Sequence, residues 1–216
     1  MAVRILIVDD HAVVRRGVRA LLESRADWEV CGEATTGRDA VEQFQRLRPD
    51  VVVMDLSLPD LNGLEATRQI VKAAPNAEVL VLTMHNSEEL ARDVLLAGAR
   101  GYVLKSDAAE KLIAAVECLQ QHKPFLTSAI TEFVLGDYVR RGDSAKEEEA
   151  PVALTPRERE IIQLVAEGQS SKEAASKLRL SVKTVETHRA NIMKKLRLRS
   201  ISDLVRYAIR NNIVEP

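Results

Sequence analysis

The sequence is poor in the residues that mark several classes of protein. Only 3% of its 216 residues are aromatic, so aliphatic side chains must form its hydrophobic core. Its two cysteines, Cys31 and Cys118, are too few for a disulfide-rich framework and lack the spacing of zinc ligands. No apolar run approaches the roughly 20 residues that a membrane helix requires. We therefore expect a globular protein with an aliphatic core and no membrane contact.

The amino terminus also lacks the pattern of a secretory signal. It reads MAVRILIVDD, a short apolar run that ends in two acids, without the longer apolar stretch and small-residue cleavage site of a signal peptide. We expect a cytoplasmic protein in which both cysteines are free thiols.

The net charge of −1 hides an asymmetry along the chain. Residues 151–216 contain 13 Lys and Arg against 7 Asp and Glu, whereas residues 1–150 contain 18 against 25. A basic part joined to an acidic part indicates two domains with different tasks. The basic part is a candidate for binding nucleic acid.

Short apolar runs alternate with amphipathic stretches of helical length over the first 121 residues. The predicted strands are Val3–Val8, Trp28–Cys31, Val51–Met54, Val79–Leu82 and Tyr102–Leu104. The predicted helices are Val13–Leu22, Asp39–Leu47, Leu64–Ala73, Glu88–Ala97 and Ala108–Leu119. This strict alternation predicts an α/β fold, a doubly wound five-stranded parallel sheet.

The strand pattern stops in the second half of the chain. A helix is predicted over Ser128–Arg141, followed by a polar, charged linker that ends at Pro151. Four further helical patterns follow, at Pro156–Glu167, Ser171–Leu178, Val182–Leu196 and Ser202–Asn211. They predict an all-α four-helix domain of helix-turn-helix type. We divide the chain into a first domain over 1–121, a helical and flexible linker over 122–153 and a second domain over 154–216.

Charged and hydroxyl side chains stand at the ends of the predicted strands. The set is Asp9, Asp10, Asp55, Thr83 and Lys105. Each residue alone has an ordinary explanation as a turn residue or a solvated side chain. Together they would meet at one edge of the sheet, where ligands of such folds bind. Three carboxylates with room for water favour Mg²⁺, and Asp55 beside an ammonium and a metal is a plausible phosphoryl acceptor.

Four segments at those strand ends, VDDH, MDLSLPDLNG, LTMH and GYVLKS, resemble the receiver domain of response regulators over about residues 3–121. The resemblance implies that a sensor histidine kinase phosphorylates Asp55. It also implies that Asp10, Asp55 and the Ser57 carbonyl hold Mg²⁺, while Asp9 orients the shell of ligands around the metal.

The same resemblance implies a switch. Thr83 and Lys105 would bind the phosphoryl oxygens, and Tyr102 would change rotamer when Thr83 moves. The alternative for Tyr102 is a tyrosine at the edge of the core with its hydroxyl in water. Many receivers have proline after the lysine, where this chain has Ser106. The isomer of the Lys105–Ser106 bond is left open.

The segment from Leu154 to Leu196 resembles a LuxR-type helix-turn-helix, and the whole chain resembles the NarL/FixJ family. Val185, His188, Ile192 and Leu196 share the face expected to pack inward. The outward face holds Lys183, Thr184, Glu186, Thr187, Ala190, Asn191 and Lys194. We expect phosphate contacts from Lys183, Lys194, Lys195 and Arg197. Base contacts are expected from Glu186, Thr187, Ala190 and Asn191.

The resemblance further implies a homodimer on promoter duplex DNA in the active state, with a contact through the last helix. Candidate contact residues at helical spacing are Ile201, Leu204, Val205 and Ala208. Some of them must cover the core of their own domain, so only a part is expected at an interface.

Three alternatives remain at the level of the sequence. The first is a phosphatase or phosphotransferase of the haloacid-dehalogenase type, although such enzymes have a second Asp where this chain has Ser57. The second is a regulator that dimerises constitutively, although the acidic pocket looks complete. The third is an RNA-binding antiterminator, whose helices lack the turn and recognition-helix pattern of Ser171–Leu196.

Overall fold

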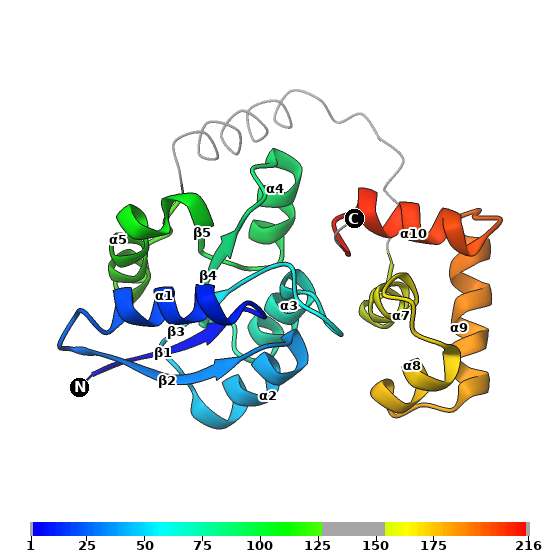
Figure 1. Cartoon of the computed structure of the whole chain (residues 1–216), viewed down its shortest axis with the longest axis horizontal. Helices are drawn as coiled ribbons and strands as arrows, with labels where there is room; N and C mark the ends of the chain where they lie inside the picture. Colours follow the sequence, from blue (N-terminus) through cyan, green and yellow to red (C-terminus); the bar gives the residue numbers. More distant parts are fainter. Residues whose placement is uncertain (1, 127–153, 215–216) are drawn as a thin grey trace. The chain divides into compact units, whose positions relative to one another are not determined.

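The computed structural model describes residues 2–126 and 154–214, and these fall into two compact units. The division lies within the segment 127–153 (Figure 1). The predicted helix Ser128–Arg141 and the predicted linker after it lie outside the described residues. Each unit is taken by itself below.

The amino-terminal unit is a five-stranded sheet in which every strand pair is parallel. Its strands are β1 (Val3–Val8), β2 (Trp28–Ala34), β3 (Val51–Met54), β4 (Glu78–Thr83) and β5 (Gly101–Leu104). They lie side by side in the order β2-β1-β3-β4-β5. The predicted doubly wound sheet is thereby confirmed. Strand β2 runs beyond the predicted Cys31, and its register with β1 shifts between Ile5 and Leu6.

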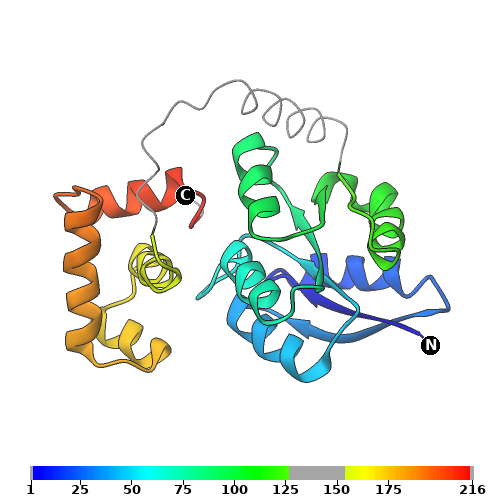
Figure 2. The same ribbon diagram turned by 180° about the vertical axis from the view of Figure 1, so that it is seen from behind.

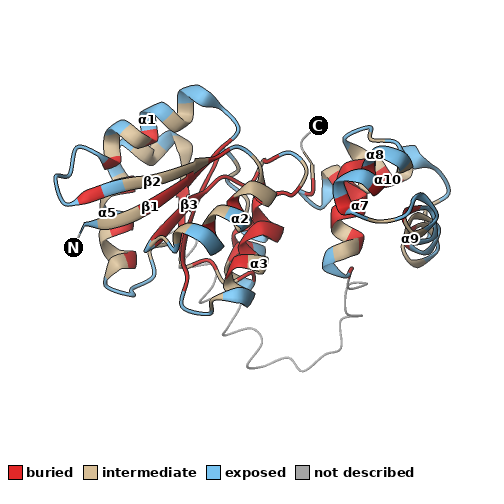
Figure 3. Ribbon diagram, turned by 90° about the horizontal axis from the view of Figure 1, so that it is seen from below, coloured by how far each residue is buried: buried red, intermediate tan, exposed pale blue. Residues whose placement is uncertain are grey.

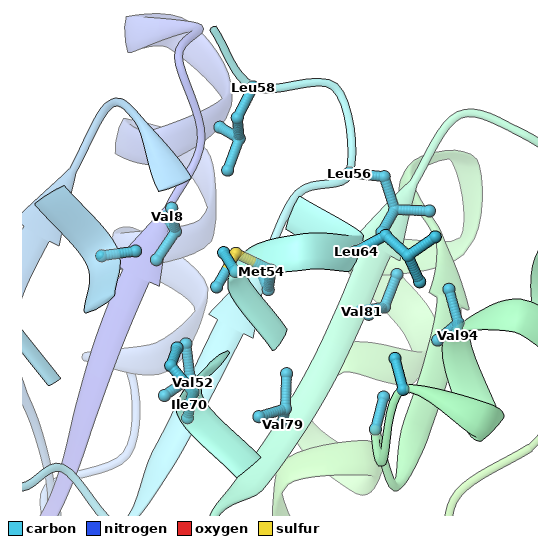
Figure 4. Close-up of a cluster of buried hydrophobic side chains, with 14 of the residues drawn as sticks. Val8, Val52, Met54, Leu56, Leu58, Leu64, Ile70, Val79, Val81 and Val94 are labelled. Carbon is cyan, nitrogen blue, oxygen red and sulfur yellow. The ribbon is translucent and has the colours of Figure 1, made fainter. Parts of the chain in front are cut away.

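Helices cover both faces of the sheet because its strands are apolar on both sides. The five helices are α1 (Ala12–Leu22), α2 (Gly37–Leu47), α3 (Gly63–Ala73), α4 (Glu88–Leu96) and α5 (Ala108–Gln120). One core joins α1 and α5 to one face of the sheet. The other core joins α2, α3 and α4 to the opposite face through Val52, Met54 and Val81 (Figure 4).

The central strands β3 and β4 are buried along their whole length, whereas the edge strand β2 is mostly half-buried and appears tan in Figure 3. Alternate residues of a strand point to opposite faces. Val52 and Met54 accordingly belong to the core under α2, α3 and α4, whereas Val51 and Val53 belong to the core under α1 and α5. This two-sided burial fixes the strand register, so the residues that follow each strand are held in place.

The chain returns to the sheet after α5, which the sequence did not lead us to expect. Phe125 forms a parallel bridge with Gly101 of β5. Its amide donates to the Arg100 carbonyl at 2.9 Å, and its carbonyl accepts from the Tyr102 amide at 3.0 Å. The residues after α5 therefore occupy the outer side of β5.

The carboxyl-terminal unit is a small helical domain. Its helices are α7 (Pro156–Ala166), α8 (Ser171–Leu178), α9 (Val182–Lys195) and α10 (Ile201–Arg210). Thr155 and Glu158 form a capping box at the start of α7, and Ser170 and Glu173 form one at the start of α8. The helices enclose an aliphatic core that confirms the predicted all-α domain. Among the described residues, we find no helix with the length and apolar character of a membrane span.

Candidate functional site

The carboxyl edge of the sheet gathers the acidic residues that the sequence singled out. Asp9 follows β1 and Asp55 follows β3, in neighbouring strands. The Asp9 amide donates to the Ala34 carbonyl at 3.1 Å, and the Asp55 amide donates to the Val8 carbonyl at 2.8 Å. These bonds extend the sheet by one residue, so both carboxylates start from a fixed backbone.

Lys105 joins these two carboxylates. It follows β5, and its Nζ lies 2.7 Å from Oδ2 of Asp55 and 2.8 Å from Oδ2 of Asp9. The side chains of Asp9 and Asp55 are only 4% and 2% exposed. Burial disfavours the ammonium, but its bonds to Asp55 and Asp9 outweigh that cost and raise the pKa of Lys105. A half-buried cation thus holds two buried anions together.

Asp55 is fixed at both of its oxygens. Oδ2 binds Lys105, and Oδ1 accepts the Leu56 amide at 2.8 Å. Burial raises the pKa of the Asp55 carboxyl to about 6, although Lys105 favours the charged form. A carboxylate with one oxygen on a cation and one on an amide has a defined orientation, as a nucleophile for in-line transfer requires.

Asp10 and His11 complete the acidic cluster at its exposed rim. Nδ1 of His11 lies 2.7 Å from Oδ1 of Asp10, and the His11 amide donates to Oδ1 of Asp9 at 2.7 Å. Ligand atoms of Asp9, Asp10, His11 and Asp55 all lie within 4.8 Å of one another. Three carboxylates at that spacing fit a hard divalent cation such as Mg²⁺.

Two residues of this edge received no role from the sequence alone. His11 stands in the VDDH segment and caps the Asp9 carboxylate through its amide. Gly63 starts α3, and a Cβ there would lie 1.8 Å from the Asp55 carbonyl oxygen. Only glycine allows α3 to approach Asp55 so closely. The glycine at the end of MDLSLPDLNG was the available signal. Ser57 is half-buried in the same loop, and its predicted role as a metal ligand stays a prediction.

Thr83 and Tyr102 are linked through the backbone of His85. Thr83 is fully buried at the end of β4, and its hydroxyl accepts the His85 amide at 3.2 Å. Tyr102 is also fully buried, and its hydroxyl donates to the His85 carbonyl at 2.5 Å. The alternative of a Tyr102 hydroxyl in water is therefore wrong, because the hydroxyl has a protein acceptor inside the unit. No peptide bond in the described ranges is cis, so the Lys105–Ser106 bond is trans.

Helix α9 presents two different faces, as the sequence predicted. Val185 and Ile192 are fully buried, while His188 and Leu196 are half-buried. The outward residues Lys183, Glu186, Thr187, Ala190, Asn191 and Lys194 are exposed. The helix is thus held by the domain core and leaves a polar, basic face open to another molecule.

Two of the predicted outward residues, and the predicted phosphate contact Lys195, have partners inside the domain. The Thr184 hydroxyl lies 2.8 Å from the Ser181 hydroxyl at the helix cap, and Thr187 donates to the Lys183 carbonyl at 2.9 Å. Nζ of Lys195 pairs with Glu158 of α7 at 2.7 Å. Lys195 therefore serves to hold α9 against α7, which the prediction of a phosphate contact did not anticipate.

Arg189 was not singled out by the sequence, yet it also fixes α9. Its guanidinium donates to the Ser171 hydroxyl at the start of α8 at 2.6 Å. A lone arginine in a basic helix gives no signal for such a contact, because its partner is 18 residues away.

The four candidate dimer residues of α10 divide into two pairs. Leu204 and Ala208 are 1% and 0% exposed within the domain core, so the prediction that they form an interface is corrected. They face inward because α10 must cover α7. Ile201 is 44% exposed and Val205 is half-buried, which leaves these two as candidates.

Comparisons with known proteins agree with both units. Residues 5–117 match the response regulator receiver domain, and residues 152–208 match the bacterial regulatory proteins of the luxR family. The oxygen regulatory protein NreC of Staphylococcus carnosus is 40% identical to this chain over 215 residues. That alignment covers 98% of this chain and 99% of NreC.

Solved structures of relatives resemble it as well. A two-component response regulator of the LuxR family from Aurantimonas is 37% identical with a TM-score of 0.60. It matches over 64% of this chain and 99% of its own. The response regulator RcsB in complex with DNA is 28% identical with a TM-score of 0.58, over 98% of this chain and 99% of its own.

Proposed function

The chain belongs to the response regulators that join a receiver domain to a LuxR-type DNA-binding domain, and we propose that Asp55 is its phosphorylation site. It is a two-component response regulator that controls transcription by binding DNA, and it is not an enzyme. The alternative of a phosphatase of the haloacid-dehalogenase type is thereby set aside. The observation that carries the proposal is Lys105 bridging Asp9 and Asp55 at the carboxyl edge of the sheet.

A sensor histidine kinase is the phosphoryl donor in this proposal. A carboxylate oxygen of Asp55 attacks the phosphorus of a phosphohistidine. A P–O bond forms, and the P–N bond to the histidine breaks, so the electron pair returns to the imidazole. The acceptor must be charged, and the ammonium of Lys105 stabilises that form. The product is an aspartyl phosphate beside the same ammonium.

Magnesium is the metal that we propose for this pocket. Asp10, Asp55 and the Ser57 carbonyl would hold the ion, and Asp9 would orient its water shell. When bound, Mg²⁺ supplies positive charge that offsets repulsion between the carboxylates and the phosphoryl oxygens. Asp10 fits the role of direct ligand because its side chain is 33% exposed at the rim. Asp9 is nearly buried behind it and is engaged by His11 and Lys105.

The switch proposal starts from the phosphoryl charge of roughly −1.5 to −2. Lys105 leaves Asp9 in part to bind phosphoryl oxygens, and the Thr83 hydroxyl turns toward them and away from the His85 amide. The Tyr102 hydroxyl, held on the same residue, then changes its environment. A coupling of roughly 1–3 kcal/mol between this edge and DNA binding would change affinity about 5- to 150-fold.

Promoter duplex DNA is the proposed partner of α9, and an RNA target is the alternative that a shift assay with both nucleic acids distinguishes. RcsB has been solved as dimers on DNA. We extend this to a homodimer of the present chain with Ile201 and Val205 at the contact. Lys183 and Lys194 would bind phosphates, and Glu186, Ala190 and Asn191 would reach bases. We retain the domain boundaries 1–121, 122–153 and 154–216 and a cytoplasmic location as parts of the proposal.

The decisive experiment compares wild type, Asp55→Asn and Asp27→Asn. Each protein is treated with acetyl phosphate and Mg²⁺, and the incorporated phosphoryl group and the affinity for DNA are measured. We expect both responses in wild type and in Asp27→Asn, whose carboxylate is exposed before β2 at the other edge of the sheet. Asp55→Asn should show neither response. Equal stimulation of all three proteins would reject Asp55 as the acceptor, whereas equal DNA affinity without stimulation in any of them would favour the constitutive alternative.

A second experiment addresses the basic face of α9. Lys194→Ala should weaken binding to specific and random duplexes alike and should flatten the dependence of log affinity on log salt by roughly 0.9. An unchanged slope would show that Lys194 does not contact phosphate.

A further inference from the structure

The carboxyl-terminal unit has a second basic feature that lies outside α9. Four arginines, Arg197, Arg199, Arg206 and Arg210, surround a surface hollow of about 360 Å³ beside Tyr207. We call this feature the arginine hollow. It spans the turn after α9 and one side of α10, so residues from two elements converge on it.

The charge in the arginine hollow is unbalanced. Asp203 is the one carboxylate in its lining. Its Oδ1 binds Arg206 at 2.7 Å, and its Oδ2 accepts the Ser200 hydroxyl at 2.8 Å at the start of α10. Within residues 154–214, no carboxylate pairs with the guanidinium of Arg197, Arg199 or Arg210. Three cations therefore share one hollow without a counterion from the described chain.

The chemistry of the arginine hollow selects its ligand. Guanidinium groups bind phosphate oxygens in pairs through parallel N–H donors, which a lysine cannot do. The half-buried ring of Tyr207 adds an apolar wall against which a sugar can lie. The lining therefore suits a phosphate group attached to a sugar, and it disfavours a cation or a purely apolar ligand.

The position of the arginine hollow favours DNA as the source of that phosphate. Helix α10 starts where α9 ends, as Figures 1 and 2 both show. Arg197 follows the last residue of α9 by two positions, and its left-handed backbone, with φ of 53°, turns the chain toward α10. Lys194 is exposed in the last turn of α9. Basic side chains thus continue from the recognition helix into the hollow.

We infer that the arginine hollow binds a backbone phosphate of the DNA beyond the bases that α9 reads. This inference rests on the proposed function, because it assumes that α9 docks on duplex DNA. The contact adds affinity without base preference. It also fixes the position and orientation of the end of α9 on the duplex. A free nucleotide has the same phosphate chemistry, and the experiment separates the two sources.

The test uses the full-length protein treated with acetyl phosphate. A double variant, Arg199→Ala with Arg210→Ala, is compared with wild type and with Arg16→Ala with Arg46→Ala, which removes the same charge from the receiver. These four side chains form no hydrogen bond or ion pair within the described residues, so folding should be retained and is checked by circular dichroism. A charge-retaining variant, Arg199→Lys with Arg210→Lys, shows whether charge or the guanidinium fork matters.

We expect the hollow variant to lose roughly tenfold or more in affinity for specific and random duplexes at low salt. Its salt slope should fall by roughly 0.9, which is the change expected when one phosphate contact is lost. The lysine variant should keep the slope and lose part of the affinity. The receiver variant should match wild type.

An unchanged slope in the hollow variant would overturn the inference. Binding of AMP by wild type that the hollow variant loses, with DNA binding intact, would also overturn it and assign the hollow to a free nucleotide. Failure of the proposed function looks different. In that case wild type itself shows no preference among duplexes, and Asn191→Ala changes nothing.

Discussion

The carboxyl edge of the sheet and the exposed face of α9 differ in whether their charged and polar side chains find partners within the protein. At the sheet edge, the buried carboxylates of Asp9 and Asp55 already hold the ammonium of Lys105. On α9, Lys183, Asn191 and Lys194 are exposed, and their side chains have no partner within the described residues. The receiver site is therefore specified by the fold, whereas the proposed DNA-binding face of α9 would be completed only by another molecule.

The largest expected effect tests whether the fold alone specifies the receiver site. Gly63→Ala places a methyl group 1.8 Å from the Asp55 carbonyl oxygen, so α3 or the end of β3 must move. We expect the free energy of unfolding to fall by about 4 kcal/mol, above the usual cost of overpacking, because the clash is with backbone. The single tryptophan, Trp28, lies buried in the receiver and reports its unfolding in urea.

The matched control is Gly17→Ala in α1, where a Cβ meets no atom within 4 Å. It should stabilise the receiver by roughly 0.5–1 kcal/mol, because alanine favours a helix over glycine. Equal effects of the two substitutions would contradict the close approach of α3 to Asp55.

Two neighbouring residues of α9, one buried and one exposed, should respond differently to replacement by alanine. Ile192→Ala removes a fully buried side chain and should destabilise the carboxyl-terminal domain by about 3 kcal/mol. Asn191→Ala lies on the exposed face and should change stability by less than about 0.5 kcal/mol. The same Asn191→Ala should reduce the preference for specific DNA by about 1–3 kcal/mol. Amide hydrogen exchange in α9 and competition between duplexes measure the two effects.

Reversal of that pattern would break the comparison between the two regions. If Asn191→Ala destabilised α9 while leaving DNA preference unchanged, its side chain would belong to the fold and not to the interface.

A smaller effect is expected from removing the cation at the sheet edge. Lys105→Met leaves two buried carboxylates side by side, and we expect a loss of about 2 kcal/mol in metal-free buffer. The loss is moderated because one carboxyl takes up a proton. Adding Asp55→Asn should restore most of the lost stability. Mg²⁺ should reduce the loss in the single variant Lys105→Met. Urea unfolding followed by Trp28 fluorescence measures the stability in these three conditions, with wild type as the reference.

If Lys105→Met is as stable as wild type in the presence of a chelator, then Lys105 does not hold the carboxylates together. The site would in that case resemble the DNA face in lacking an internal partner.

The smallest effect concerns Tyr102. Tyr102→Phe removes one buried hydrogen bond to the His85 carbonyl and should cost about 1 kcal/mol of receiver stability. Leu95→Ile, at a half-buried position of α4 without such a bond, is the control and should cost less. A Tyr102→Phe variant as stable as wild type would mean that the hydrogen bond to His85 stabilises the folded receiver no more than a hydrogen bond to water stabilises the unfolded chain.

The sequence predicted the fold because the apolar residues recur with the period of the strand or helix whose buried face they form. The ends of β1 and β3 were predicted to the residue, since the apolar runs stop where the acids begin. Convergence of Asp9, Asp55 and Lys105 followed from parallel strands ending at one edge. The sequence could not reveal the Phe125 bridge or the Lys195–Glu158 pair, because each joins segments by tertiary packing without a local pattern.

The same limit applied to α10. Four apolar residues at helical spacing predicted one stripe, but the stripe is wider than the core beneath it. Leu204 and Ala208 fill the core, and Ile201 lies at its margin. Which members of a stripe remain outside depends on how closely α7 approaches, and that distance is set by side chains elsewhere in the domain.

The Phe125 bridge also determines how the sheet ends. β5 is the outermost strand of its side, and an open edge would offer its amides and carbonyls for strand addition by another polypeptide. Phe125 occupies that position with bonds to Arg100 and Tyr102. Foreign chains therefore meet an edge that is already closed at this point, and any shift of Tyr102 along the strand pulls on the residues that lead out of the receiver.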